Sequence, residues 1–185
     1  MRSRRSRPAP TRLAAETAVL TQLPYDHPDA ARLVRALFDE QVGRYGFADP
    51  IAADPADYAP PRGLFLVAYT NGTPCACGGY RPYGPRTDTA EIKKLYTVPG
   101  LRGQGVGALI LTRLEAHAAA RGARSAILET GVRNDAALLL FKSAGYRPTP
   151  QYVTGRDPAI NRAFLKDLPG PDSPPSQKNG RTMPR

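Results

Sequence analysis

Apolar positions recur along the chain with two different spacings, and each spacing predicts one kind of element. Helical spacing predicts one helix over residues 29–45, before Gly46, and a second over residues 106–120, before Gly122. A third helical pattern covers residues 134–143 and ends near Gly145. Shorter alternating or continuous apolar runs predict strands over residues 17–23, 64–69, 74–80, 90–98, 125–130, 146–154 and 162–165.

The turns between these elements predict how the strands pair. Asn71-Gly72 is a strong hairpin signal between the second and third strands. The middle of the chain reads strand–helix–strand–helix, which predicts one locally parallel pair of strands. The predicted order is therefore β-α-β-β-β-α-β-α-β-β. Residues 48–63 are rich in Pro and Asp and predict a long loop, a type of segment that often covers a binding site.

Length and charge narrow the class of protein. The 185 residues suffice for one domain, expected over residues 14–168, with disordered tails at 1–13 and 169–185. Residues 1–12 supply five of the ten net positive charges and residues 170–185 supply two, so the interval between them carries only +3. No basic face with interleaved aromatics is visible in that interval, which argues against nucleic-acid binding. The Arg-rich N-terminus lacks the apolar core of a secretory signal, and no apolar run approaches the length of a membrane span.

The cysteines and histidines predict neither a disulfide nor a metal site. Cys75 and Cys77 lie two apart on one predicted strand, so we expect both side chains on the same face, as small packing residues. Unbridged cysteines fit a reducing cytoplasm. His27 and His117 are far apart and have no companion ligands, so no metal is expected.

A glycine-rich turn at residues 102–107 is the main candidate for ligand binding. Glycine allows a sharp turn and a close ligand approach, and the first turn of a helix leaves its amides unpaired. The amides of residues 103–108 are therefore expected to form an anion site suited to phosphate oxygens; these residues are Gly103, Gln104, Gly105, Val106, Gly107 and Ala108. The alternative is a tight strand–helix connection that binds nothing. The sequence matches neither the P-loop nor the dinucleotide fingerprint.

Two segments together resemble the GNAT superfamily of acyl-CoA-dependent N-acyltransferases. Arg102, Gly105 and Gly107 match its Gln/Arg-x-x-Gly-x-Gly/Ala motif. The later stretch NDAALLLFKSAGY is similar to a second family segment through five residues, namely Asn134, Ala137, Leu140, Gly145 and Tyr146. The resemblance covers roughly residues 15–166.

The resemblance implies an α/β (α+β) fold with a mixed central sheet of about seven strands and a V-shaped splay between the fourth and fifth. It implies that acetyl-CoA lies in that splay, with the pyrophosphate on the glycine turn led by Arg102. The pantetheine arm would pair with the strand edge at Tyr96, Thr97 and Val98. Asn134 would contact the cofactor arm, cap the following helix, or do both.

Acyl transfer to an amine also needs a base, because an alkylamine is protonated at neutral pH. Glu91 and Glu129 lie on the two strands that flank the splay and are the candidate bases. The alternative for Glu91 is a salt bridge with Lys93 or an arginine. The family usually places a tyrosine acid where this chain has Phe141, so the thiolate would leave unaided or another tyrosine, Tyr146 or Tyr152, would protonate it.

The function that these observations predict is acetyl transfer from acetyl-CoA to a primary amine of a small molecule or amino-acid-like acceptor. Direct transfer in a ternary complex is expected, because neither cysteine belongs to the splay. Two alternatives stay open at this point: a non-catalytic acyl-CoA sensor, and a protein acetyltransferase acting on N-termini or lysines. Dimers are common in the family, and no residue pattern here specifies one. Lys93 and Lys94, as strand neighbours, are expected to face opposite sides.

Overall fold

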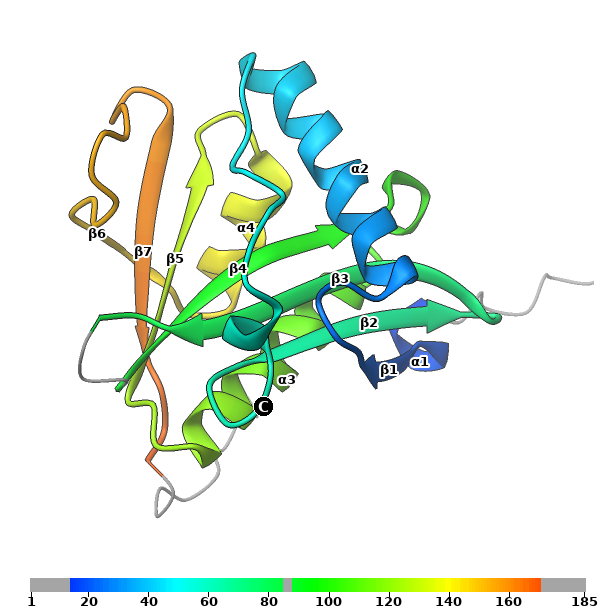
Figure 1. The fold of residues 1–185 in the computed structure, drawn as a ribbon. Coiled ribbons are helices and arrows are strands. Elements are labelled where there is room, and N and C mark those ends of the chain that lie inside the picture. Colours follow the sequence, from blue (N-terminus) through cyan, green and yellow to red (C-terminus); the bar gives the residue numbers. More distant parts are fainter. Residues whose placement is uncertain (1–13, 85–87, 171–185) are drawn as a thin grey trace, which may run out of the picture.

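The computed structural model describes residues 14–84 and 88–170 (Figure 1), so the predicted tails lie almost entirely outside the described residues. A seven-stranded sheet runs through the molecule in the order β1-β2-β3-β4-β5-β7-β6. The strands are β1 Val19–Gln22, β2 Leu64–Thr70, β3 Thr73–Pro82, β4 Thr89–Thr97, β5 Ser125–Gly131, β6 Arg147–Thr149 and β7 Asn161–Asp167. The helices are α1 Ala14–Thr17, α2 Pro28–Tyr45, α3 Val106–Ala120 and α4 Asp135–Ser143, with short 3-10 turns η1 Pro55–Tyr58 and η2 Pro99–Leu101.

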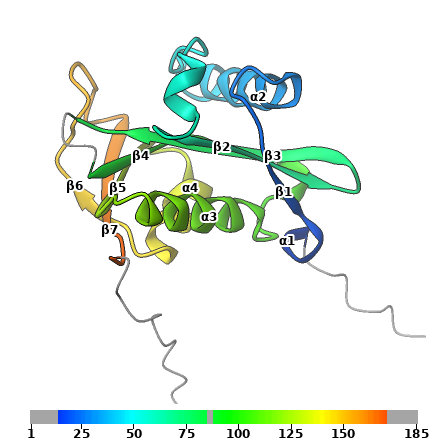
Figure 2. The same cartoon turned by 60° about the horizontal axis from the view of Figure 1, so that its bottom comes forward.

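Helices cover both faces of the sheet. Figure 2 shows α2 on one face and α1, α3 and α4 on the other. The β2 strand serves both sides, because Leu64 and Leu66 belong to the core cluster under α3, whereas Phe65 and Val67 belong to the cluster under α2. These four residues of β2 are almost fully buried, as the continuous apolar run predicts for a strand between two layers. Among the described residues, no helix is long and apolar enough to cross a bilayer.

Most predicted elements are confirmed within one or two residues. The helix expected over 106–120 has those bounds, and Asn71 and Gly72 both have positive φ, at 51° and 74°, as a two-residue hairpin turn requires. The helix α1 was not expected, since residues 14–17 show no helical pattern. The strand expected over 146–154 is shorter, because β6 ends at Thr149 and only Arg147, Pro148 and Thr149 pair with β7.

The expected splay lies between β4 and β5, the parallel pair of the sheet. These strands pair at only three positions, Thr89 with Ser125, Ala90 with Ala126 and Glu91 with Ile127. Beyond that point β4 continues to Thr97 and β5 to Gly131 without pairing to each other. Figure 1 shows the two strands diverging, with α4 beside the opening. The predicted mixed seven-stranded sheet and its parallel central pair are confirmed.

A bulge in β3 corrects the expectation for the cysteines. Tyr69 pairs with Pro74 and Ala68 pairs with Ala76, so Cys75 is an extra residue on its strand. Cys75 therefore packs in the cluster under α3, whereas Cys77 packs in the cluster under α2. The prediction that both face the same side is wrong, because the bulge shifts the alternation by one residue. Both thiols are free and buried.

Candidate active site

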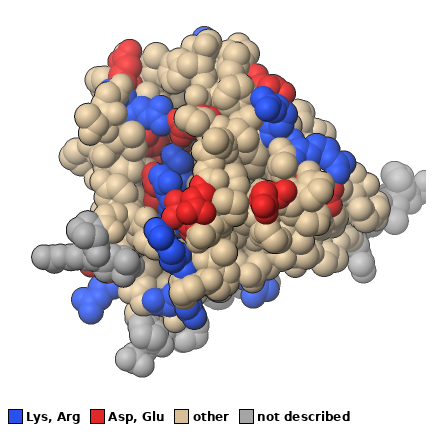
Figure 3. All heavy atoms as spheres, in the orientation of Figure 1, with Lys and Arg blue, Asp and Glu red and all other residues tan. Residues whose placement is uncertain are grey.

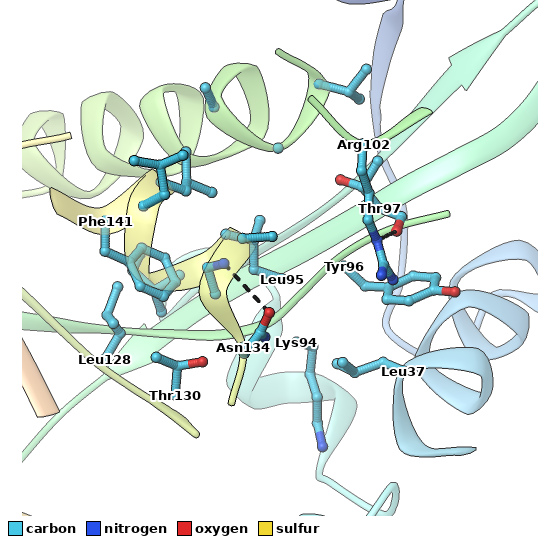
Figure 4. Close-up of a pocket in the computed structure, with 18 of the residues that line it drawn as sticks. Leu37, Lys94, Leu95, Tyr96, Thr97, Arg102, Leu128, Thr130, Asn134 and Phe141 are labelled. Atoms are coloured by element: carbon cyan, nitrogen blue, oxygen red, sulfur yellow. Dashed lines mark hydrogen bonds between the residues drawn. The ribbon is translucent and has the colours of Figure 1, made fainter. Parts of the chain in front are cut away.

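A cavity of about 390 Å³ occupies the opening between β4 and β5. Its walls come from β4, the glycine turn with the start of α3, the end of β5 with α4, and the inner side of α2 (Figure 4). Eleven of the fourteen residues expected in the site line this cavity, namely Tyr96, Thr97, Arg102, Gly103, Gly105, Val106, Gly107, Ala108, Glu129, Asn134 and Phe141. Val98, Gln104 and Glu91 are not among the lining residues.

The glycine turn presents unpaired amides at one end of the cavity. Gly103 and Gly105 have φ of 73° and 82°, a backbone that glycine adopts without strain, and Gly105 caps the N-terminus of α3. Within the described part of the chain, none of the six amides from 103 to 108 donates a hydrogen bond to a protein acceptor. The turn is braced from behind by α1, since the Ala15 amide donates to the Gln104 carbonyl at 3.2 Å. The site thus keeps the donors that an anion needs.

Arg102 lies at the mouth of this turn, but protein groups already engage its guanidinium. Its Nε donates to the Thr97 carbonyl at 2.9 Å, and its Nη2 pairs with Glu40 of α2. The same guanidinium lies 5.6 Å from the centre of the Tyr96 ring. Arg102 therefore ties α2 to the end of β4 through two of its five donors, and the main-chain amides add further donors for a phosphate.

A second bulge shapes the edge of β4. Cys77 pairs with Tyr96 and Gly79 with Lys93, so β4 has two residues, Lys94 and Leu95, opposite Gly78 alone. Lys94 has a positive φ of 57°. The prediction that Lys93 and Lys94 face opposite sides is wrong, because the bulge breaks the alternation. The Lys93 ammonium is 3.1 Å from Asp49, and that of Lys94 donates to the neighbouring Pro50 carbonyl at 2.8 Å.

Asn134 caps α4, as one of its two expected roles requires, while its contact with a cofactor stays a prediction. Its Oδ1 accepts a hydrogen bond from the Ala137 amide at 3.4 Å, which makes it the N-cap of α4. It also lines the cavity (Figure 4), where its side chain lies between β4 and β5.

The two candidate bases have different surroundings. Glu91 is buried away from the cavity, where Arg81 bonds one carboxylate oxygen at 2.8 Å and the Tyr152 hydroxyl donates to the other at 3.1 Å. Lys93 lies 3.6 Å from the same carboxylate. The salt bridge considered as the alternative for Glu91 is therefore present, and every oxygen of this carboxylate has a partner.

Glu129 faces the cavity with one oxygen unsatisfied. Its Oε2 lies 3.3 Å from Arg156 Nε, whereas Oε1 is buried and has no hydrogen-bond partner among the described residues. Burial raises the pKa of Glu129, and this effect exceeds the opposite influence of Arg156 and Lys93. A carboxylate with a raised pKa and a free oxygen, on the wall of a cavity, has the properties of a general base.

Asp49, in the long loop before β2, links these charged groups, and the sequence did not single it out. It lines the cavity and pairs with both Lys93 and Arg156. Its only sequence signal was its place in the Pro- and Asp-rich loop. Arg156 lies 107 residues away along the chain, and no local pattern marks it. Figure 3 shows the resulting mixture of acidic and basic side chains on this face.

The two tyrosines considered for the acid step, Tyr146 and Tyr152, are not among the residues that line the cavity. Phe141 is buried on the cavity wall, with its ring centre 5.8 Å from that of Tyr146. Burial raises the pKa of both tyrosine hydroxyls, which makes each a weaker acid.

Comparison with known protein families identifies the family of this chain. The sequence model of the Acetyltransferase (GNAT) family matches residues 33–146, well over half of the chain. The chain belongs to the GNAT family. An uncharacterized N-acetyltransferase of Schizosaccharomyces pombe is 30% identical over 149 residues, which cover 78% of this chain and 90% of the relative. This GNAT protein is accordingly an acyltransferase.

Solved structures share the GNAT fold. A protein described as an acyl-CoA N-acyltransferase from Klebsiella pneumoniae superposes with a TM-score of 0.68 at 24% identity, covering 82% of this chain and 97% of that one. An acetyltransferase from Salmonella typhimurium, solved with its cofactor acetyl-CoA, has a TM-score of 0.63 at 18% identity and covers 82% and 94% of the two chains. At these identities the likeness concerns the fold.

Proposed function

We propose that this GNAT protein transfers an acetyl group from acetyl-CoA to a primary amine of a small-molecule acceptor, by direct transfer in a ternary complex. The observation that carries the proposal is the set of backbone amides at residues 103–108, which donate no hydrogen bond to any described residue. They lie at the end of a cavity beside a splayed pair of strands. Six amides at a helix N-terminus suit the pyrophosphate of acetyl-CoA. The Salmonella typhimurium neighbour holds that molecule in the same fold.

The remaining contacts follow from the cavity walls. The main chain at Tyr96 and Thr97 lies at the open edge of β4, where the pantetheine arm can pair as an added strand. Unpaired amides at this edge would also polarise the thioester carbonyl. Asn134 is positioned between the two strands for a contact with the same arm. Val98 fits less well, because its amide already donates to the Cys75 carbonyl at 2.9 Å.

Glu129 is the residue that we assign as the base. The acceptor ammonium gives one proton to Glu129, and the neutral nitrogen attacks the thioester carbon to form the C–N bond. When the tetrahedral intermediate collapses, the C–S bond breaks and the nitrogen loses its second proton to water. The departing thiolate takes up a proton from water, because a thiol pKa near 8.5 makes it an adequate leaving group. No covalent enzyme intermediate is needed, since both Cys75 and Cys77 are buried in the core clusters and neither lines the cavity.

A matched pair of variants tests this assignment. Glu129→Gln is expected to lower kcat by about 10²- to 10⁴-fold while leaving acetyl-CoA binding intact. Glu91→Gln removes one partner of Arg81 and of Lys93, so it should mainly reduce stability, by about 1–2 kcal/mol, because Arg81 keeps Asp57 and Lys93 keeps Asp49 as a carboxylate partner. The exposed Asp39→Asn serves as the charge-matched control. The assay is release of free thiol from acetyl-CoA with a panel of amines.

Three results would count against the proposal. Absence of heat on mixing the protein with CoA would remove the pyrophosphate site. Glu129→Gln with the wild-type rate at pH 7 would remove the base. Thiol release with peptides or proteins, and none with small amines, would show that the acceptor is a macromolecule.

A further inference from the structure

The cavity extends past β4 toward α2 and the loop before β2, away from the glycine turn. Leu37, Gln41, Asp49 and Lys94 line this end. Figure 4 shows Lys94 reaching in that direction, beside Leu37 and far from the turn at Arg102. If acetyl-CoA occupies the turn and the β4 edge, this end is the space left for the acceptor.

The acidic groups that line the cavity already have cationic partners. Glu40 pairs with Arg44 at 2.8 Å and also with Arg102. Asp49 and Glu129 both pair with Arg156. The charges of these acids are balanced within the protein, so they give no reason to expect a further positive charge on the acceptor besides its amine.

Lys94 differs from the other cations of the cavity. Among the described residues, no carboxylate lies within 4.0 Å of its ammonium, and its one hydrogen-bond partner there is the neutral Pro50 carbonyl. An ammonium carries three donors, so two remain. The side chain is half-buried, and this burial lowers the pKa of Lys94 against the opposite influence of Asp49.

The backbone of Lys94 adds a separate observation. Its φ of 57° is a conformation that favours Gly or Asn and strains a long side chain. The chain nevertheless has lysine at this bulge, with its ammonium brought into the acceptor end of the cavity. Strained residues of this kind concentrate at ligand sites.

We propose that Lys94 binds a carboxylate of the acceptor, so that the substrates are amines that also carry a carboxylate, such as free amino acids. This inference rests on the proposed acetyltransferase function and narrows its substrate class. The acceptor carboxylate would take the two remaining Lys94 donors, while its amine reaches Glu129 on the facing strand. The competing role for Lys94 is only to hold the loop through the Pro50 carbonyl.

The test compares amino acids with their carboxamides, which have the same side chain and amine position but lack the negative charge. With L-amino acids and L-amino acid amides as probes, wild-type kcat/KM should favour the free acids by about 10- to 100-fold, the range for a charge-assisted hydrogen bond. Lys94→Met should abolish this preference, and Lys94→Arg should retain most of it. Lys142→Met, which removes an exposed lysine of α4, should leave the ratio unchanged.

Equal kcat/KM for acids and carboxamides in the wild-type protein would overturn the inference. So would a Lys94→Met variant that loses the same factor with both, since that is the pattern of a residue that only holds the loop. Thiol release with none of the amines, despite acetyl-CoA binding, would instead overturn the proposed function, and the inference with it.

Discussion

Asp49 offers the sharpest test of the charged network, because it bridges two cations on different elements. Its carboxylate lies 3.1 Å from the Lys93 ammonium on β4 and also pairs with Arg156 in the loop between β6 and β7. Burial acts to raise the pKa of Asp49, but Lys93 and Arg156 outweigh it and lower the pKa from 3.8 to about 2. The ionised form is thus stabilised by the fold.

The magnitude follows from that pKa difference. One pKa unit corresponds to 1.36 kcal/mol, so Asp49→Asn should lower the free energy of unfolding at pH 7 by about 2 kcal/mol. A depressed pKa contributes stability above the unfolded value and loses it as pH falls through the folded value. The deficit of the variant should therefore shrink between pH 4 and pH 2. In a chain of this size, about 2 kcal/mol corresponds to roughly 4–8 °C in Tm.

The same variant should also change the pH dependence of catalysis. The groups facing Glu129 are Arg156, Lys93, Asp49, Glu91 and Tyr152. Without Asp49, the charges of Arg156 and Lys93 act more strongly on Glu129 and lower its pKa. Because the base works only when deprotonated, the acid limb of kcat/KM should move to lower pH.

Denaturant unfolding at several pH values and a pH–rate profile measure both effects, with Asp39→Asn as the exposed control. A stability deficit that stays constant down to pH 2 would show that the loss is not ionic. An acid limb that does not move, in a variant that remains folded, would falsify the link between Asp49 and Glu129.

Two further predictions concern the glycine turn and the leaving thiolate. Gly105→Ala should lower the free energy of unfolding by about 1–2 kcal/mol and weaken CoA binding in calorimetry, because the φ of Gly105 is 82° and a Cβ there would lie 3.1 Å from that of Ala15. The control is Gly43→Ala in α2, where the space around the glycine is open. This change should be neutral or stabilising by up to about 1 kcal/mol. Equal effects of the two changes would contradict the role of the turn. Phe141→Tyr should leave kcat unchanged if the thiolate departs unaided, and a tenfold rise would show that its protonation limits the rate.

Interactions between residues close in the chain were largely predictable. The bounds of α3, the hairpin at Asn71-Gly72 and the glycine turn depend on periodicity and on backbone preferences that act over a few residues. The parallel pair β4–β5 follows from element order, because a strand, a helix and a strand connect in one preferred way. The splay of this pair, where the cavity lies, was implied only by the resemblance to the GNAT superfamily.

The chemistry inside the cavity depended on contacts between distant segments. Two bulges, at Cys75 and at Lys94, move side chains to a face of the sheet other than the one that simple alternation predicts. No residue type in the sequence indicates either bulge. The sequence offered both Glu91 and Glu129 as strand carboxylates, with Glu91 as the first choice of base. Only packing separates them, because Arg81 and Tyr152 satisfy Glu91 outside the cavity lining. Glu129 lines the cavity and has one buried oxygen without a partner among the described residues.

Periodicity and turn preference are short-range properties that each segment carries by itself, so they specified the elements, their order and the glycine turn. Charge pairing is different, because its energy depends on which groups share a low-dielectric space. Asp49 and Arg156 meet across 107 residues only when the sheet is assembled. The choice of base and the unpaired Lys94 therefore belong to the folded molecule.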